Sequence, residues 1–203
     1  MLSSAVSVAV QGIDAVIVEV EVDIVKGLPG FTIVGLPDST IKEARERIRS
    51  AVENSGFEFP PQNFVVNLAP AGFRKQGANF DLPIAMAILA TTGQIACDHS
   101  AYPMVGELSL DGRIKPVRGA IAMAIGLFKE GYRRVIVPFD NRSEAAAIEG
   151  IEVFPARNIR EAIEICGGGG APYTGAGGRS SVRRHRDDFS EVRGQESAKR
   201  ALE

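Results

Sequence analysis

Two glycine-containing loops carry basic residues beside predicted strands and helices, a pattern that could bind phosphate groups. The first loop lies in NLAPAGFRKQGANFDLPIAMAIL and carries Arg74 and Lys75. The second lies in MVGELSLDGRIKPVRGAIAMAI and carries Arg113, Lys115 and Arg118. Lysine and arginine are the side chains that contact nucleic-acid phosphates, so these five residues are candidate DNA contacts. The alternative is that the glycines only permit the turns and that the cations are solvated, those of the second loop guarding a strand edge.

Signatures of catalytic and metal sites are absent from the sequence. It contains no GxxxxGKS/T phosphate loop, no HExxH and no GxSxG, and its cysteines, Cys97 and Cys166, form no CxxC pair. Carboxylates alternate along one predicted strand at Glu19, Glu21 and Asp23. No facing histidine or carboxylate cluster is evident, and such a row is typical of a solvated strand face. We therefore expect no catalytic residue, no metal site and no cofactor in this chain.

Hydrophobic periodicity predicts the elements that must position the two loops. Alternation over residues 16–25 predicts a half-buried strand. The apolar stripe within residues 41–52 predicts one helix, for which Asp38, Ser39 and Thr40 supply capping oxygens and Thr40 and Glu43 have capping-box spacing. The other expected elements, in chain order, are strand FTIVGL, strand 64–68, buried helix 82–91, strand 104–110, a helix from Pro116 to Glu130, strand RRVIVP, a helix around 144–148, strand IEVF and helix 159–166. This order predicts an α+β fold with a mixed sheet.

Charge and glycine content divide the chain after residue 166. Residues 1–166 have a net charge of −4 and residues 167–203 a net charge of +2. Seven of the twelve residues in GGGGAPYTGAGG are glycine, and such a stretch behaves as a flexible coil. We predict a domain over 1–166, a Gly/Arg-rich linker over 167–186 and, over 187–203, the start of a further domain in which the chain stops inside a helix. Four more candidate DNA contacts lie in the linker: Arg179, Arg183, Arg184 and Arg186.

Composition bounds the class of protein. Hydrophobic residues make up 45% and charged residues 24% of the 203 residues, which are globular values and argue against wholesale disorder. No apolar run approaches the roughly 18 residues of a membrane span, and no basic and apolar leader opens the chain. We therefore expect a cytoplasmic protein without a membrane partner.

The two motifs, followed by GYRRVIVP, carry a family resemblance. In order and spacing they resemble the proteolytic domain of Lon proteases and the Lon-like domain of the RadA recombination proteins. With the opening SSAVSVAVQGIDAVIVEVEVDIVKGLPGFTIVGLPD and the closing DDFSEVRGQESAKRALE, the whole chain resembles the N-terminal part of the ComM/YifB family of magnesium-chelatase-like AAA+ ATPases. The resemblance implies a Lon-protease-like fold, a sandwich of sheet and helices of the ribosomal-protein-domain-2-like kind.

The same resemblance implies that proteolytic chemistry has been lost. Lon-type proteases use a serine nucleophile that a lysine activates, and in this sequence Asp81 takes the place of the serine and Ile121 the place of the lysine. A carboxylate is no substitute for the hydroxyl nucleophile, and an isoleucine cannot accept a proton. We therefore expect a non-proteolytic module.

For the longer protein, the resemblance implies a hexameric DNA motor. It would promote branch migration as incoming single-stranded DNA is integrated in natural transformation, with ATP and Mg²⁺ bound in a module beyond Glu203. Its partners would be single-stranded or branched DNA and further copies of itself, and the fragment alone would not be an enzyme. Because residues 1–166 are acidic overall, a second interpretation stays open: an interaction or assembly domain of a magnesium-chelatase-like remodelling ATPase, without DNA contact.

Overall fold

A four-stranded mixed sheet forms one half of the molecule in the computed structural model, which describes residues 2–12, 14–96, 101–175 and 200. The strands, in spatial order, are β1 (Ser3–Gln11), β2 (Asp14–Val25), β4 (Asn63–Ala69) and β3 (Gly30–Val34). β2 pairs antiparallel with both β1 and β4, whereas β3 and β4 run parallel. The mixed sheet and its helices confirm the predicted α+β class.

The long β1–β2 ladder buries apolar residues on both of its faces. The molecule has two hydrophobic cores. Ala5 and its partner Val20 belong to the first core. Val8, three residues after Ala5 and therefore on the opposite face, belongs to the second core together with its partner Ile17. Successive strand residues point to opposite faces, so a sheet of this kind can be covered on both sides. This ladder is therefore shared by the two halves of the molecule.

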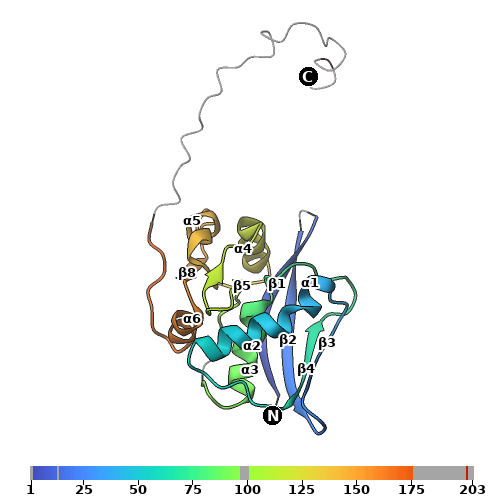
Figure 1. The fold of residues 1–203 in the computed structure, drawn as a ribbon. Helices are drawn as coiled ribbons and strands as arrows, with labels where there is room; N and C mark the ends of the chain where they lie inside the picture. Colours follow the sequence, from blue (N-terminus) through green and yellow to red (C-terminus); the bar gives the residue numbers. More distant parts are fainter. Residues whose placement is uncertain (1, 13, 97–100, 176–199, 201–203) are drawn as a thin grey trace, which may run out of the picture.

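Helices cover the first face of the sheet. They are α1 (Ser39–Lys42), α2 (Ala44–Asn54), α3 (Asp81–Thr91) and α6 (Ile159–Cys166). α3 packs against β1 and β2, and α2 lies across α3 on the outer side (Figure 1). Residues 82–89 of α3 are all buried, which confirms the predicted buried helix.

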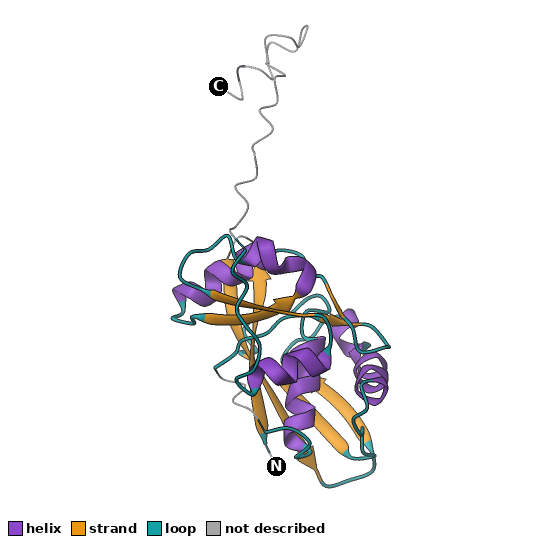
Figure 2. Ribbon diagram, turned by 90° about the vertical axis from the view of Figure 1, so that its left-hand side faces the viewer, coloured by secondary structure: helices purple, strands orange, loops and turns teal. Residues whose placement is uncertain are grey.

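The second half is built on a parallel pair of strands and a short hairpin. Its elements are β5 (Glu107–Leu108), β6 (Ile114–Lys115), α4 (Ala120–Lys129), β7 (Arg134–Pro138), η1 (Phe139–Asn141), α5 (Arg142–Ala145) and β8 (Glu152–Ala156). β7 and β8 run parallel and form a two-stranded sheet of their own. Figure 2 shows strands, in orange, in both the upper and the lower part of the molecule. Gly126 lets α4 approach β2, because a Cβ atom there would lie 2.3 Å from the Cβ of Ala15. In the described part of the chain, no helix is both long enough and apolar enough to cross a membrane.

The helix expected after Thr40 is divided in two, and Asp38 alone of the three expected capping residues is its N-cap. Asp38 is the N-cap of α1, where its Oδ1 accepts the backbone N–H of Ile41 at 2.9 Å. Glu43 then lies between α1 and α2 with no side-chain cap bond. The capping role expected of Asp38 is therefore confirmed, whereas the capping box of Thr40 and Glu43 was wrong.

The strand expected over residues 104–110 is much shorter, because the backbone of Gly106 is hydrogen-bonded to Asn79 and Leu82, at the start of α3, and not to a neighbouring strand. The N–H of Gly106 donates to the carbonyl of Asn79, and the carbonyl of Gly106 accepts the N–H of Leu82, both at 3.0 Å. Only β5 remains as a strand, and Met104 makes an isolated bridge to Ile136. The helix expected around 144–148 also begins earlier, as α5.

The glycine-rich stretch after α6 does not run free of the domain. The N–H of Tyr173 donates to the carbonyl of Val153 at 2.7 Å, and its ring packs against the second core. The expectation of an unpacked coil from residue 167 is thus corrected at Tyr173, whose ring supplies the apolar surface that the glycines lack. The domain limit at 166 stays a prediction. Arg179, Arg183, Arg184 and Arg186 lie outside the described residues.

Candidate functional site

The two motifs meet along a groove of about 590 Å³, which we call the first groove. Residues 76–79, before α3, and residues 116–118, before α4, line it together with Asp38 and Glu107. Gly77 adopts a φ of +87°, and its N–H donates to Oδ2 of Asp38 at 3.1 Å. The Asn79 side chain donates to the carbonyl of Val8 at 3.0 Å. These bonds hold the loop of the first motif against β1 and the start of α1.

Asp81, which the family resemblance aligns with the Lon serine, is held by Arg47. Its carboxylate accepts Nε of Arg47 on Oδ2 at 2.9 Å and Nη2 on Oδ1 at 3.1 Å, and Oδ2 also accepts the N–H of Leu108 at 3.2 Å. The Asp81 side chain is 1% exposed. The pair joins α2, α3 and β5, so this carboxylate links three elements of the first core.

The electrostatics of this pair follow from its burial. Desolvation raises the pKa of the Asp81 carboxyl, while Arg47 and the Leu108 N–H oppose that rise. The hydrogen bond to Asp81 raises the pKa of Arg47. The carboxylate oxygens are thus occupied by donors, and Asp81 is not among the residues that line the first groove. It performs a structural role.

Ile121, which the family resemblance aligns with the Lon lysine, lies on the first turn of α4 and is 39% exposed. Its N–H donates to Oε1 of Glu144 at 3.1 Å. The lining residues of the first groove include the hydroxyl of Thr40 but no lysine, histidine or cysteine that could activate or replace it. A serine–lysine dyad of the Lon kind is therefore not present among the residues that line this groove.

We expect no peptidase activity from this chain, because neither dyad position can supply its chemistry. Fluorescently labelled casein should stay intact with wild type and with Asp81→Ser, since the serine variant has no base and leaves Arg47 without its partner. Product release measured over hours would check this. Cleavage by wild type that disappears in Asp81→Ala would show that the carboxylate has taken over a catalytic role.

Lys75 is fully buried, which corrects its prediction as a DNA contact. Nζ donates to the carbonyl of Gly35 at 3.0 Å and to the carbonyl of Pro70, and it lies 4.5 Å from the centroid of the Phe73 ring. Burial lowers the pKa of the Lys75 ammonium. The side chain fastens the first-motif loop to the turn after β3 and is not available to a phosphate.

The other predicted cations do not all line the same groove. Arg118 is exposed and lines the first groove, and Arg74 is exposed on its loop outside that lining. Arg113 pairs with Asp111 at 2.7 Å, and Nζ of Lys115 lies 3.8 Å from Glu107. Arg113 and Lys115 line a second groove, together with Arg157, a residue that the motif search did not find. Nothing in the sequence near Arg157 marks it, because its neighbours in this groove come from distant segments.

Comparison with known proteins places these features in a family. The family model described as "Subunit ChlI of Mg-chelatase" matches residues 20–141. "Uncharacterized protein YifB" of Escherichia coli strain K12 is 42% identical over 196 residues, which are 96% of this chain and 38% of that protein. "Competence protein ComM" of Haemophilus influenzae is 37% identical over 207 residues, covering 99% of this chain and 40% of that protein.

A weaker likeness connects the chain to proteases. "Lon protease 2" of Bacillus subtilis is 25% identical over 127 residues, which are 62% of this chain and 23% of that protein. The chain thus spans about two fifths of the curated YifB and ComM relatives that it matches. The family match includes both walls of the first groove and Asp81. The chain therefore belongs to the Mg-chelatase ChlI family, and it is similar along nearly its whole length to YifB and ComM.

Proposed function

We propose that this chain is the N-terminal, non-proteolytic domain of a ComM-type hexameric AAA+ ATPase, a DNA branch-migration helicase of natural transformation and recombination. The observation that supports it most is the similarity to "Competence protein ComM" over 99% of the chain. The Asp81–Arg47 pair supports the non-proteolytic part, since Asp81, the residue that the resemblance aligns with the Lon serine, is held in a buried ion pair. In this proposal the domain covers 1–166, a linker covers 167–186, and the ATPase domain starts within 187–203. The protein acts in the cytoplasm.

ATP and Mg²⁺ belong, in this proposal, to the rest of the longer protein. The sequence has no GxxxxGKS/T loop, and the described residues contain no group of three His, Cys, Asp or Glu side chains that could hold a metal ion. Under this proposal, the described residues of this chain supply no ligand to ATP or Mg²⁺. Its contribution would be to contact DNA or to organise the ring.

The decisive test is the ATPase rate of the full-length protein with and without single-stranded and branched DNA. We expect DNA to raise the rate. Arg74→Gln/Arg118→Gln, which removes two exposed cations, should weaken DNA binding and flatten its salt dependence by about 0.7 in log–log slope for each phosphate that is no longer neutralised. Arg49→Gln is the matched control, because Arg49 is also exposed but pairs with Glu53 on α2. The proposal would be rejected if DNA changed neither the ATPase rate nor the assembly of the ring.

The second candidate function is an assembly or interaction domain that touches no DNA. The net charge of −4 over residues 1–166 favours it, because it disfavours broad contact with a polyanion. Under this alternative, DNA would neither bind to the protein nor raise its ATPase rate. Substitutions in this domain would instead change the assembly of the ring, measured by analytical ultracentrifugation.

A further inference from the structure

A second groove, of about 370 Å³, lies where the parallel strands β7 and β8 end. Phe139 and Asp140 of η1 follow β7 directly, and Arg157 follows β8 directly. The carboxyl ends of parallel strands are the usual place for ligands in sheets of this kind. The topology therefore brings two segments from one sheet edge into a single concave surface.

The β5–β6 hairpin forms the other wall and is fixed to the end of β8. The N–H of Ile114 donates to the carbonyl of Arg157 at 2.8 Å, and the N–H of Ile159 donates to the carbonyl of Gly112 at 3.2 Å. These bonds place Arg113 and Lys115 opposite the η1 segment in the same lining. Cations from segments far apart in the sequence thus converge on one groove.

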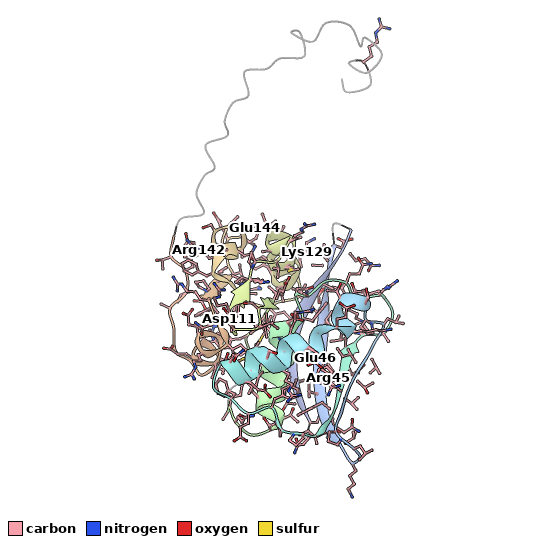
Figure 3. The ribbon with its side chains drawn as sticks, viewed as in Figure 1. Arg45, Glu46, Asp111, Lys129, Arg142 and Glu144 are labelled. Atoms are coloured by element: carbon pink, nitrogen blue, oxygen red, sulfur yellow. The ribbon has the colours of Figure 1, made fainter. Side chains whose placement is uncertain are left out.

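Stacking on Phe139 orients the arginine side chains at this groove. The guanidinium carbon of Arg157 lies 3.5 Å from the centroid of the Phe139 ring, and that of Arg142 lies 3.8 Å from it. Nη1 of Arg142 also donates to the Phe139 carbonyl at 2.6 Å. An aromatic ring attracts a guanidinium that lies over its face, so Phe139 restrains both arginine side chains beside the groove. Figure 3 labels Arg142, and also Asp111 on the hairpin that forms the facing wall.

Carboxylates near the groove compensate these cations only weakly. Asp111 pairs with Arg113 at 2.7 Å, Glu107 lies 3.8 Å from Lys115, and Glu161 lies 3.8 Å from Arg157. These pairs are at the surface, where an ion pair stabilises by about 0–1 kcal/mol, so a phosphate can compete for the cations. The three acids are outside the lining, and Asp140 is the carboxylate that lines the groove itself. The lining therefore presents three cations and one anion.

We propose that this second groove binds phosphate groups of a single DNA strand, with Arg113, Lys115 and Arg157 as the contacts. The inference rests on the proposed function, because it needs DNA as the partner. A groove with walls on both sides admits one flexible backbone more readily than a stiff duplex. Contacts to phosphate carry no sequence information, so binding here is independent of sequence. Arg142 acts through Phe139, as a positioning residue.

The experiment measures the affinity of the full-length protein for a labelled homopolymeric DNA strand at two salt concentrations. Arg157→Gln and the double variant Arg113→Gln/Lys115→Gln should each weaken binding roughly tenfold at the lower salt, with a salt slope shallower by about 0.7 for each phosphate no longer bound. Asp140→Asn should bind about twofold tighter, because a like charge beside the phosphate is gone. This opposite sign separates a binding site from a merely structural one.

The matched control is Arg133→Gln. Arg133 also stacks on a phenylalanine, 4.5 Å from the Phe128 centroid, but it precedes β7 and so lies at the opposite end of that strand. The Arg133→Gln variant should bind the DNA strand with the affinity of wild type. Should Arg157→Gln unfold, the double variant of two exposed hairpin residues still tests the groove, and thermal melts with ring assembly identify such a case.

The outcomes separate this inference from the proposed function. If wild type binds DNA but the hairpin variant stays within twofold of it, or Asp140→Asn does not tighten binding, the second groove is not the contact and only this inference falls. If wild type binds no DNA under any condition, both fall. Weakening confined to duplex DNA would also overturn the assignment to a single strand.

Discussion

Replacing Arg47 by methionine should lower the free energy of unfolding by about 3–5 kcal/mol at neutral pH, because it leaves a buried carboxylate without its cation. Asp81 is 1% exposed and takes two hydrogen bonds from Arg47. The Leu108 N–H would remain as its hydrogen-bond donor among the contacts described. Methionine fills part of the volume of the arginine stem, so the loss reports mainly on charge and hydrogen bonding.

This loss should increase with pH. Burial already raises the pKa of Asp81 above its ordinary value of 3.8, and removal of Arg47 raises it further. The folded variant then binds the Asp81 proton more tightly than the unfolded chain does. Stability therefore falls as pH rises from the ordinary pKa toward the raised one. Urea unfolding at pH 4.5 and pH 7.5 should show the larger deficit at pH 7.5.

Arg49→Met, on the same helix, is the control for that measurement. Arg49 pairs with Glu53 at 3.1 Å, and both side chains are close to half exposed. Its replacement should cost about 0.5 kcal/mol or less at either pH. A deficit of Arg47→Met that is as small as this, or that does not depend on pH, would show that Asp81 is satisfied without Arg47.

The sequence predicts most helices and strands because their hydrophobic periods are local. The buried helix over 82–91 and the strand over residues 16–25 needed only the pattern of their own residues. The strand over 104–110 could not be predicted correctly, since the backbone of Gly106 bonds to Asn79 and Leu82, which are far away in sequence. Periodicity records which face is apolar, and it does not record where backbone hydrogen bonds go.

The candidate sites were predictable only in part, for a similar reason. The family pattern marked Asp81, but its partner Arg47 becomes visible only when α2 lies across α3. Arg113 and Lys115, two of the cations at the second groove, were predicted from their loop. Arg157 joins them only because the hairpin is hydrogen-bonded to the end of β8. Tertiary contacts decide which charges share a surface. Residue type and spacing alone therefore could not predict which basic residues lie together and which are buried.

Arg74 and Lys75 show this most sharply, and they lead to the second large prediction. They are neighbours of the same charge, yet Arg74 is exposed and Lys75 is fully buried. Lys75→Met should lower the free energy of unfolding by about 1.5–3 kcal/mol, because the carbonyls of Gly35 and Pro70 lose the charged donor that they share. Arg74→Met should change it by less than about 0.5 kcal/mol.

Urea unfolding of the two variants at pH 7 measures the difference, and DNA affinity of the full-length protein separates the two roles. At urea concentrations where it stays folded, the Lys75→Met variant should bind DNA as wild type does, because the buried Lys75 ammonium of the wild type never reaches a phosphate. Arg74→Met can lose affinity without losing stability. The reverse pattern, with Lys75→Met stable but deficient in DNA binding, would mean that the ammonium leaves its carbonyl partners to contact the strand, and Lys75 would then return to the set of DNA contacts.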